Sequence, residues 1–124
     1  MAKIATHKAL RVYQSSFRAA MVIYQLSKSF PVEEKFSLTD QIRRSSRSVC
    51  ANLAEAFRKR RYPKNFVSKL SDCEAEAAET HVWLDFALAC EYVTIEDYEK
   101  LYKEYDMILG MLVKMIVEPE KWNL

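Results

Sequence analysis

The sequence predicts an all-α protein, an up-and-down antiparallel four-helix bundle that forms a single domain over residues 1–124. The 124 residues include only one Gly and three Pro, whereas turn-rich β-proteins need many of both. Hydrophobic residues make up 50% of the chain and recur with a period near 3.6 in four long segments. These observations predict helices at roughly 8–29, 38–59, 63–91 and 95–117, joined by short connections.

Each break between helices has a residue that explains it. Pro31 disfavours helix at the residue before it, so the first helix should end just before this proline. Pro63 suits the first turn of the third helix. Thr94, followed three residues later by Asp97, resembles a capping box and marks the start of the fourth helix. Pro119 ends that helix.

The first helix carries two apolar stripes. The stripe that we expect to be buried consists of Leu10, Tyr13, Phe17, Met21 and Tyr24, and the second consists of Val12, Ala19, Ile23 and Leu26. The core face of the second helix should consist of Ile42, Val49, Leu53 and Phe57. Helices one and four are apolar over more of their circumference than a four-helix core needs. Either the core is wide, or an outer stripe mediates self-association.

Gly110 interrupts the predicted fourth helix, where it costs about 1 kcal/mol relative to alanine. A close contact with another helix, within or between subunits, would compensate for this cost.

Positive charge is concentrated around the second helix. The segment "DQIRRSSRSVCANLAEAFRKRRY", residues 40–62, contains seven Arg or Lys and two acids, a net charge of +5. The following residues 63–91 carry a net charge of −4. Such a division between a basic and an acidic half points to an interaction with a charged partner, or to pairing between the two halves.

The basic side chains of the second helix lie opposite its core face. At 100° per residue, four arginines lie roughly 100–200° from Ile42, with the low side chains of Ala51 and Ala54 between them. Guanidinium groups match phosphates bidentately, and Tyr62 could stack on an exposed base. The predicted nucleic-acid-binding residues are Arg43, Arg44, Arg47, Arg58, Lys59, Arg60, Arg61 and Lys64.

The alternative interpretation is a protein-only oligomeric scaffold. In this case the acids of the third helix pair with the arginines inside the bundle, and a partner protein takes the place of RNA or DNA. Asn52 and Glu55 are interpreted as structural residues that form hydrogen bonds at a helix or subunit contact. Glu55 is expected to pair with Arg58 or Lys59, the i+3 and i+4 positions.

Enzyme functions find little support. A di-iron bundle needs Glu-x-x-His pairs, and the chain has only His7 and His81, with Ala78 three residues before the latter. One Gly excludes a glycine-rich phosphate loop. We therefore expect no enzymatic activity, no metal and no cofactor. Three widely spaced cysteines and the lack of a long apolar run indicate reduced thiols, no membrane span and a cytoplasmic location.

The segment "FPVEEKFSLTDQIRRSSRSVCANLAEAFRKR" resembles the signature of the small four-helix bundle proteins encoded in intervening sequences of bacterial 23S rRNA genes. The residues that match its first run are Phe30, Pro31, Glu34, Leu38, Thr39, Asp40, Gln41, Ile42, Arg43 and Arg44. The residues that match the second part of the family signature are Ser48, Asn52, Ala54 and Glu55. Ala56 replaces the family's usual Gly, which favours continuation of the helix.

The resemblance implies a four-helix subunit, a ring-like homopentamer and no established enzymatic activity. The chain is also similar in architecture to the accessory variability protein of diversity-generating retroelements, a basic pentamer that binds nucleic acid and a reverse transcriptase. The partners expected from these likenesses are further copies of the chain, RNA or DNA, and a protein partner.

Overall fold

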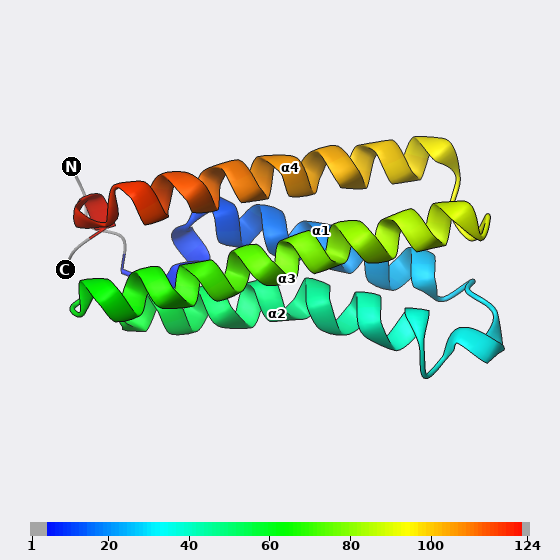
Figure 1. Cartoon of the computed structure of the whole chain (residues 1–124), viewed down its shortest axis with the longest axis horizontal. Helices are drawn as coiled ribbons and strands as arrows, with labels where there is room; N and C mark the ends of the chain where they lie inside the picture. Colours follow the sequence, from blue (N-terminus) through cyan, green and yellow to red (C-terminus); the bar gives the residue numbers. More distant parts are fainter. Residues whose placement is uncertain (1–4, 123–124) are drawn as a thin grey trace.

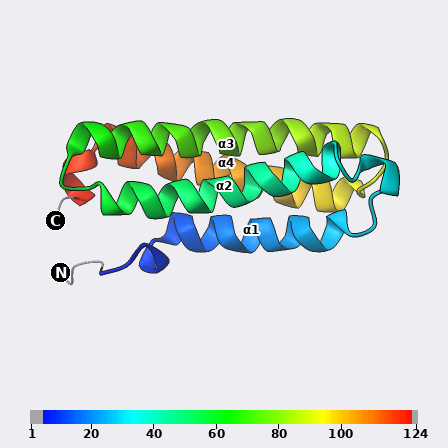
Figure 2. The ribbon, with the colours of Figure 1, turned by 90° about the horizontal axis from the view of Figure 1, so that it is seen from below.

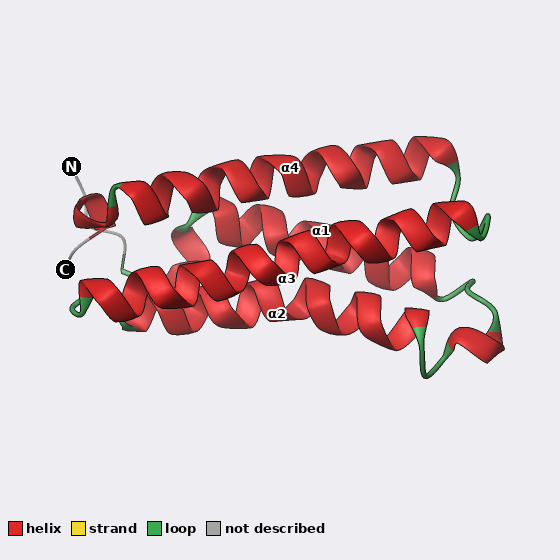
Figure 3. Ribbon diagram, in the orientation of Figure 1, coloured by secondary structure: helices red, strands yellow, loops and turns green. Residues whose placement is uncertain are grey.

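The computed structural model describes residues 5–122, which form four long antiparallel helices with no strand among them (Figures 1 and 3). The helices are α1 (Arg11–Ser27), α2 (Leu38–Arg58), α3 (Pro63–Ala89) and α4 (Ile95–Val117). Short 3-10 turns, η1 (His7–Ala9), η2 (Val32–Glu34) and η3 (Pro119–Trp122), flank them. The predicted fold class, an up-and-down four-helix bundle, is confirmed.

Each helix packs against its neighbours in the chain, and α1 also packs against α4, which closes the bundle. The most extensive helix pair is α2 with α3. The turn between these two helices lies at the same end of the molecule as η1 and η3 (Figures 1 and 2). The loop with η2 and the turn between α3 and α4 lie together at the opposite end. No helix in residues 5–122 is long and apolar enough to cross a membrane.

The helix boundaries follow the predicted breaks closely. Pro63 occupies the first turn of α3, and the Thr94 hydroxyl oxygen accepts a hydrogen bond from the backbone N–H of Asp97 at 3.1 Å. The exception is α1, which begins at Arg11 and not near residue 8. Leu10 has an extended backbone (φ −72°, ψ 129°), and residues His7–Ala9 form the separate turn η1.

The predicted core face of α1 was right at Leu10, which is buried, and wrong at Phe17 and Met21. Val12, Ala19 and Ile23, the second apolar stripe, are buried, whereas Phe17 and Met21 of the first stripe are 52% and 44% exposed. Both stripes are apolar, so hydrophobicity alone does not choose between them. Ser16, Ser27 and Ala19 share the buried face, and small side chains let α1 approach its neighbours closely.

The core face of α2 is as predicted. Ile42, Val49, Leu53 and Phe57 are buried, and Ala56 is completely buried one residue before the end of this face. The helix continues to Arg58, as the alanine at this position indicated. Burial of this face turns the opposite side of α2 outward, where the arginines lie.

Candidate nucleic-acid interface

The predicted basic residues form two groups along α2. Arg43, Arg44 and Arg47 lie in its N-terminal half, and we call them the helix cluster. The turn cluster lies at and after its C-terminus and consists of Arg58, Lys59, Arg60, Arg61 and Lys64. At 1.5 Å per residue, Arg43 and Arg58 are about 22 Å apart along the axis. The basic surface that these residues form is therefore long and has cations at both ends.

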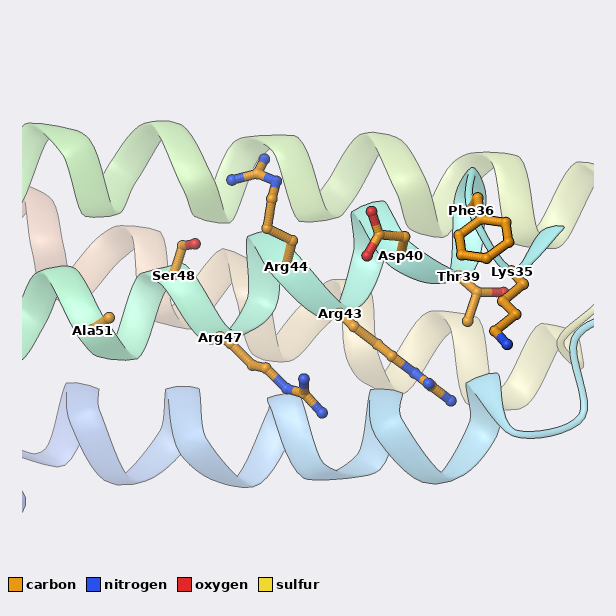
Figure 4. Close-up of a pocket in the computed structure, with 9 residues that line it drawn as sticks. All are labelled: Lys35, Phe36, Thr39, Asp40, Arg43, Arg44, Arg47, Ser48 and Ala51. Atoms are coloured by element: carbon orange, nitrogen blue, oxygen red, sulfur yellow. The ribbon is translucent and has the colours of Figure 1, made fainter.

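Within the helix cluster the predicted stripe divides. Figure 4 shows Arg43 and Arg47 extending toward α1, whereas Arg44 extends toward α3. Arg44 forms ion pairs with Glu76 (Nη1–Oε2, 3.0 Å) and Glu79 (Nη2–Oε1, 2.7 Å). The hydrogen bond to Glu79 is the main reason that the pKa of Arg44 is raised. One arginine of the cluster thus pairs with the acidic helix, as the alternative interpretation expected.

The other two arginines gather around the ring of Tyr24. The Cζ atoms of Arg43 and Arg47 lie 4.9 Å and 5.6 Å from its centroid, and Lys28 Nζ lies 4.9 Å from it. Arg43 Nε donates a hydrogen bond to Ser27 Oγ at 2.7 Å. None of the three cations has a carboxylate within 4 Å among residues 5–122. Arg43 and Arg47 are four residues apart, a spacing at which like charges repel each other.

A groove of about 580 Å³ runs along this part of α2 (Figure 4). The residues that line it are Lys35, Phe36, Thr39, Asp40, Arg43, Arg44, Arg47, Ser48 and Ala51. A second groove, of about 380 Å³, shares Arg47 and Ala51 with the first and continues between α1 and α2. The low alanine side chains expected between the arginines, Ala51 and Ala54, both line this second groove.

Two further cations of this region, Lys28 and Lys35, were not predicted from the sequence. Lys28 lies one helical turn after Tyr24, so the i, i+4 spacing could have placed it beside that ring. Lys35 lies in the loop before α2, where no helical period applies. Its position depends on the loop conformation, which the sequence alone does not give.

The turn cluster is more open. Arg58, Arg61 and Lys64 are exposed and have no ion pair with any of residues 5–122. Arg60 differs, because its Cζ lies 3.6 Å from the centroid of the Phe57 ring and its Nε donates to the Phe57 carbonyl. Burial and the neighbouring charge of Arg58 lower the pKa of Arg60. Tyr62, proposed to stack on a base, is exposed at the same turn.

Asn52 and Glu55 form a contact between α2 and α3. Lys69 Nζ donates to Asn52 Oδ1 at 3.0 Å and pairs with Glu55 Oε2 at 2.5 Å. The partner of Glu55 is therefore Lys69 and not the expected Arg58 or Lys59. The hydrogen bond with Lys69 lowers the pKa of Glu55, and the charge of Lys59 contributes less. This contact removes Glu55 as a neutralising partner for Arg58.

His81 and Asp85, four residues apart on α3, contact different side chains. His81 stacks on Tyr102, with ring centroids 3.8 Å apart, and contacts Asp106, whereas Asp85 accepts a hydrogen bond from Tyr98. Residues 5–122 contain no group of three or more His, Cys, Asp or Glu that could hold a metal ion. The three cysteines are unpaired, and burial raises the pKa of Cys50 to about 11 and that of Cys73 to about 12.

The fold and this surface define a small four-helix bundle protein with a basic second helix. The chain belongs to the 23S rRNA-intervening sequence protein family, whose profile matches residues 8–114, as the resemblance in its second helix predicted. A crystal structure of a protein of unknown function from the S23 ribosomal protein family of Bacteroides thetaiotaomicron is similar over 85% of this chain and 97% of that one. The two share 34% identity with a TM-score of 0.76. No match was found among curated proteins.

Proposed function

We propose that this protein is a non-enzymatic, cytoplasmic homo-oligomer that binds structured RNA or DNA through phosphate contacts on the basic side of α2. The observation that carries the proposal is the gathering of Lys28, Arg43 and Arg47 around Tyr24 without a carboxylate partner in residues 5–122. Three neighbouring cations repel one another, and a phosphate between them would remove that repulsion.

The length of the basic surface favours a polymer over a small anion. Arg43 of the helix cluster and Arg58 of the turn cluster are about 22 Å apart along the axis, which corresponds to about six phosphate spacings along one strand of a duplex. The alanines between the two clusters have short side chains that would let a backbone lie close to the helix. A ligand that contacts both clusters therefore has to be an extended polyanion.

The experiment is a titration of fluorescently labelled RNA and DNA with the protein at several salt concentrations. Each lost phosphate contact should reduce the slope of log affinity against log salt by about one. We expect this reduction for Arg47→Ala and for Arg58→Ala. Lys103→Ala, which removes an exposed cation from α4, is the control and should leave the slope unchanged. Unchanged slopes in the two arginine variants would contradict the proposed site.

A protein-only oligomeric scaffold is the second candidate, and exposed apolar side chains favour it. Phe17, Met21 and Val22 of α1 are exposed, as are Met107, Val113 and Val117 of α4. These are the two helices whose circumference is more apolar than a four-helix core needs. Light scattering would report the number of subunits, for which the family resemblance suggests five. An oligomer without any affinity for RNA or DNA would support the scaffold.

A further inference from the structure

Phe36 is an exposed aromatic residue at the rim of the basic groove. Its side chain is 86% exposed, although it lies only two residues before the buried start of α2 at Leu38. The ring is one of the side chains that line the groove together with Arg43 and Arg47, as Figure 4 shows. An aromatic surface beside a row of cations is the combination that single-stranded nucleic acids bind, with bases on the ring and phosphates on the cations.

The loop that carries Phe36 is held in place on both sides. The Glu34 carboxylate accepts hydrogen bonds from Ser37 Oγ at 2.6 Å, Leu38 N at 3.3 Å and Tyr92 Oη at 2.9 Å. Phe30, at the other end of the loop, is buried against the Tyr92 ring, with centroids 5.5 Å apart. The exposed position of Phe36 therefore results from a braced loop, and a ligand would meet a ring that is already in place.

Lys35 lies next to this ring, with its Nζ 5.4 Å from the Phe36 centroid. An exposed contact of this kind is weaker than the stacking of a base on an aromatic side chain. A base can therefore replace the ammonium group over the ring. Lys35 would then be free to contact the phosphate of the stacked nucleotide, and Arg43 and Arg47 continue the row of cations along the groove (Figure 4).

We infer that Phe36 stacks on an unpaired base, so that the ligand of this groove is a single-stranded or looped stretch of RNA or DNA. The inference rests on the proposed function and specifies its ligand. Inside a regular duplex the faces of each base are covered by its neighbours, so a protruding phenyl ring reaches only a base that has left the stack. The groove should therefore discriminate between nucleic acids by their strandedness.

The test compares a labelled single-stranded oligothymidylate with a blunt DNA duplex that has the same number of phosphates. We expect Phe36→Leu to weaken binding of the single strand by about tenfold and to leave duplex binding unchanged. Phe36→Trp should bind the single strand as wild type does, because an indole ring also stacks on bases. Val32→Ala is the matched control, since Val32 is also 86% exposed in the same loop but does not line the groove, and it should alter neither affinity.

The outcomes separate this inference from the function on which it rests. If wild type binds but Phe36→Leu leaves single-strand affinity unchanged, or weakens both ligands equally, stacking is overturned while phosphate binding stands. If wild type binds neither ligand at low salt, the proposed function fails together with the inference. If Phe36→Leu weakens binding of the single strand tenfold and leaves duplex binding unchanged, both base stacking and the proposed function are supported.

Discussion

The Tyr92 hydroxyl donates a hydrogen bond to Glu34 Oε2 at 2.9 Å and so joins the turn after α3 to the loop before α2. The same carboxylate accepts from the backbone N–H of Leu38, the first residue of α2. Glu34 therefore caps the helix that carries the basic surface and fixes the loop that presents Phe36. Glu34 matches the family signature but had no predicted role, and the structure shows that it stabilises the loop and the helix of the candidate interface.

Removal of this link should destabilise the bundle. We expect Tyr92→Phe and Glu34→Gln each to lower the free energy of unfolding, because each substitution weakens the hydrogen bond between these two side chains. The double variant should lose less than the sum, because both changes remove the same interaction. Urea denaturation measures all three values. Tyr62→Phe, which removes an exposed hydroxyl, is the control, and additive losses would contradict a direct coupling.

The pH dependence of this link has a defined sign at both ends of the scale. Hydrogen bonds from Ser37 and Tyr92 lower the pKa of Glu34, so its stabilising effect is present above the ordinary pKa near 4.3 and is lost as the pH falls through the lower folded value. The hydrogen bond to Glu34 raises the pKa of Tyr92 from 10.0 to about 12. That contribution is complete below pH 10 and disappears as the pH rises through 12.

Unfolding measured across the pH range checks this expectation. The difference in stability between wild type and Glu34→Gln should be constant near neutral pH and shrink toward both extremes. A difference that does not change with pH would show that the ionised carboxylate is not what holds the loop.

The sequence predicted the helices of this bundle well because Pro31, Pro63 and Thr94 are local signals whose effect on the backbone does not depend on tertiary contacts. It did not predict which stripe of α1 is buried, because both stripes are apolar and the choice depends on how closely Ser16 and Ala19 pack against neighbouring helices. Such packing is a property of the assembled bundle.

The same dependence on tertiary contacts explains why the directions of the arginine side chains in the candidate interface were not predicted. Helical periodicity placed Arg43, Arg44 and Arg47 on one side of α2, but arginine side chains are long and can turn to different neighbours. Tyr24 on α1 and the pair Glu76 and Glu79 on α3 decide where each guanidinium lies. These residues are distant in sequence, so no local pattern revealed the division.

This division predicts opposite behaviour for Arg44 and Arg47. Arg44→Ala should lower the free energy of unfolding by up to about 1 kcal/mol, since its two ion pairs are partly exposed, and should change polyanion binding little. Arg47→Ala should leave stability nearly unchanged and weaken binding. Thermal unfolding and a binding titration of the Arg44→Ala and Arg47→Ala variants test these two expectations. Equal effects of both substitutions on binding would show that Arg44 leaves its carboxylates to meet the ligand.

The core contains one side chain whose replacement should increase stability. Tyr105 is fully buried, and its hydroxyl has no hydrogen-bond partner among residues 5–122. Burial raises the pKa of this phenol. Because a buried polar group without a partner carries a desolvation cost, Tyr105→Phe should raise the free energy of unfolding by about 1 kcal/mol. Tyr98→Phe, which removes a hydroxyl bonded to Asp85, is the opposite control and should lower it.

Substitution of Gly110 by alanine tests whether α4 packs against a second copy of the chain. A Cβ atom at this position would contact nothing within 4 Å in the described part of the chain, so no close contact inside the subunit requires glycine. Gly110→Ala should therefore stabilise the subunit by about 1 kcal/mol through helix propensity. The exposed Met107 and Val113 lie three residues to either side of Gly110, on the outer face of α4. If that face packs against another subunit, the added methyl group occupies the space where the helices meet.

If the proposed homo-oligomer forms through this face, we expect both effects together: Gly110→Ala unfolds at higher urea than wild type, and its oligomer dissociates at higher protein concentration. Urea denaturation and light scattering over a dilution series measure them separately. Lys103→Ala, at another exposed position of α4, should leave assembly unchanged. Stabilisation without any change in assembly would place the subunit contact elsewhere, and the exposed face of α1 with Phe17 and Met21 would then be the surface to substitute next.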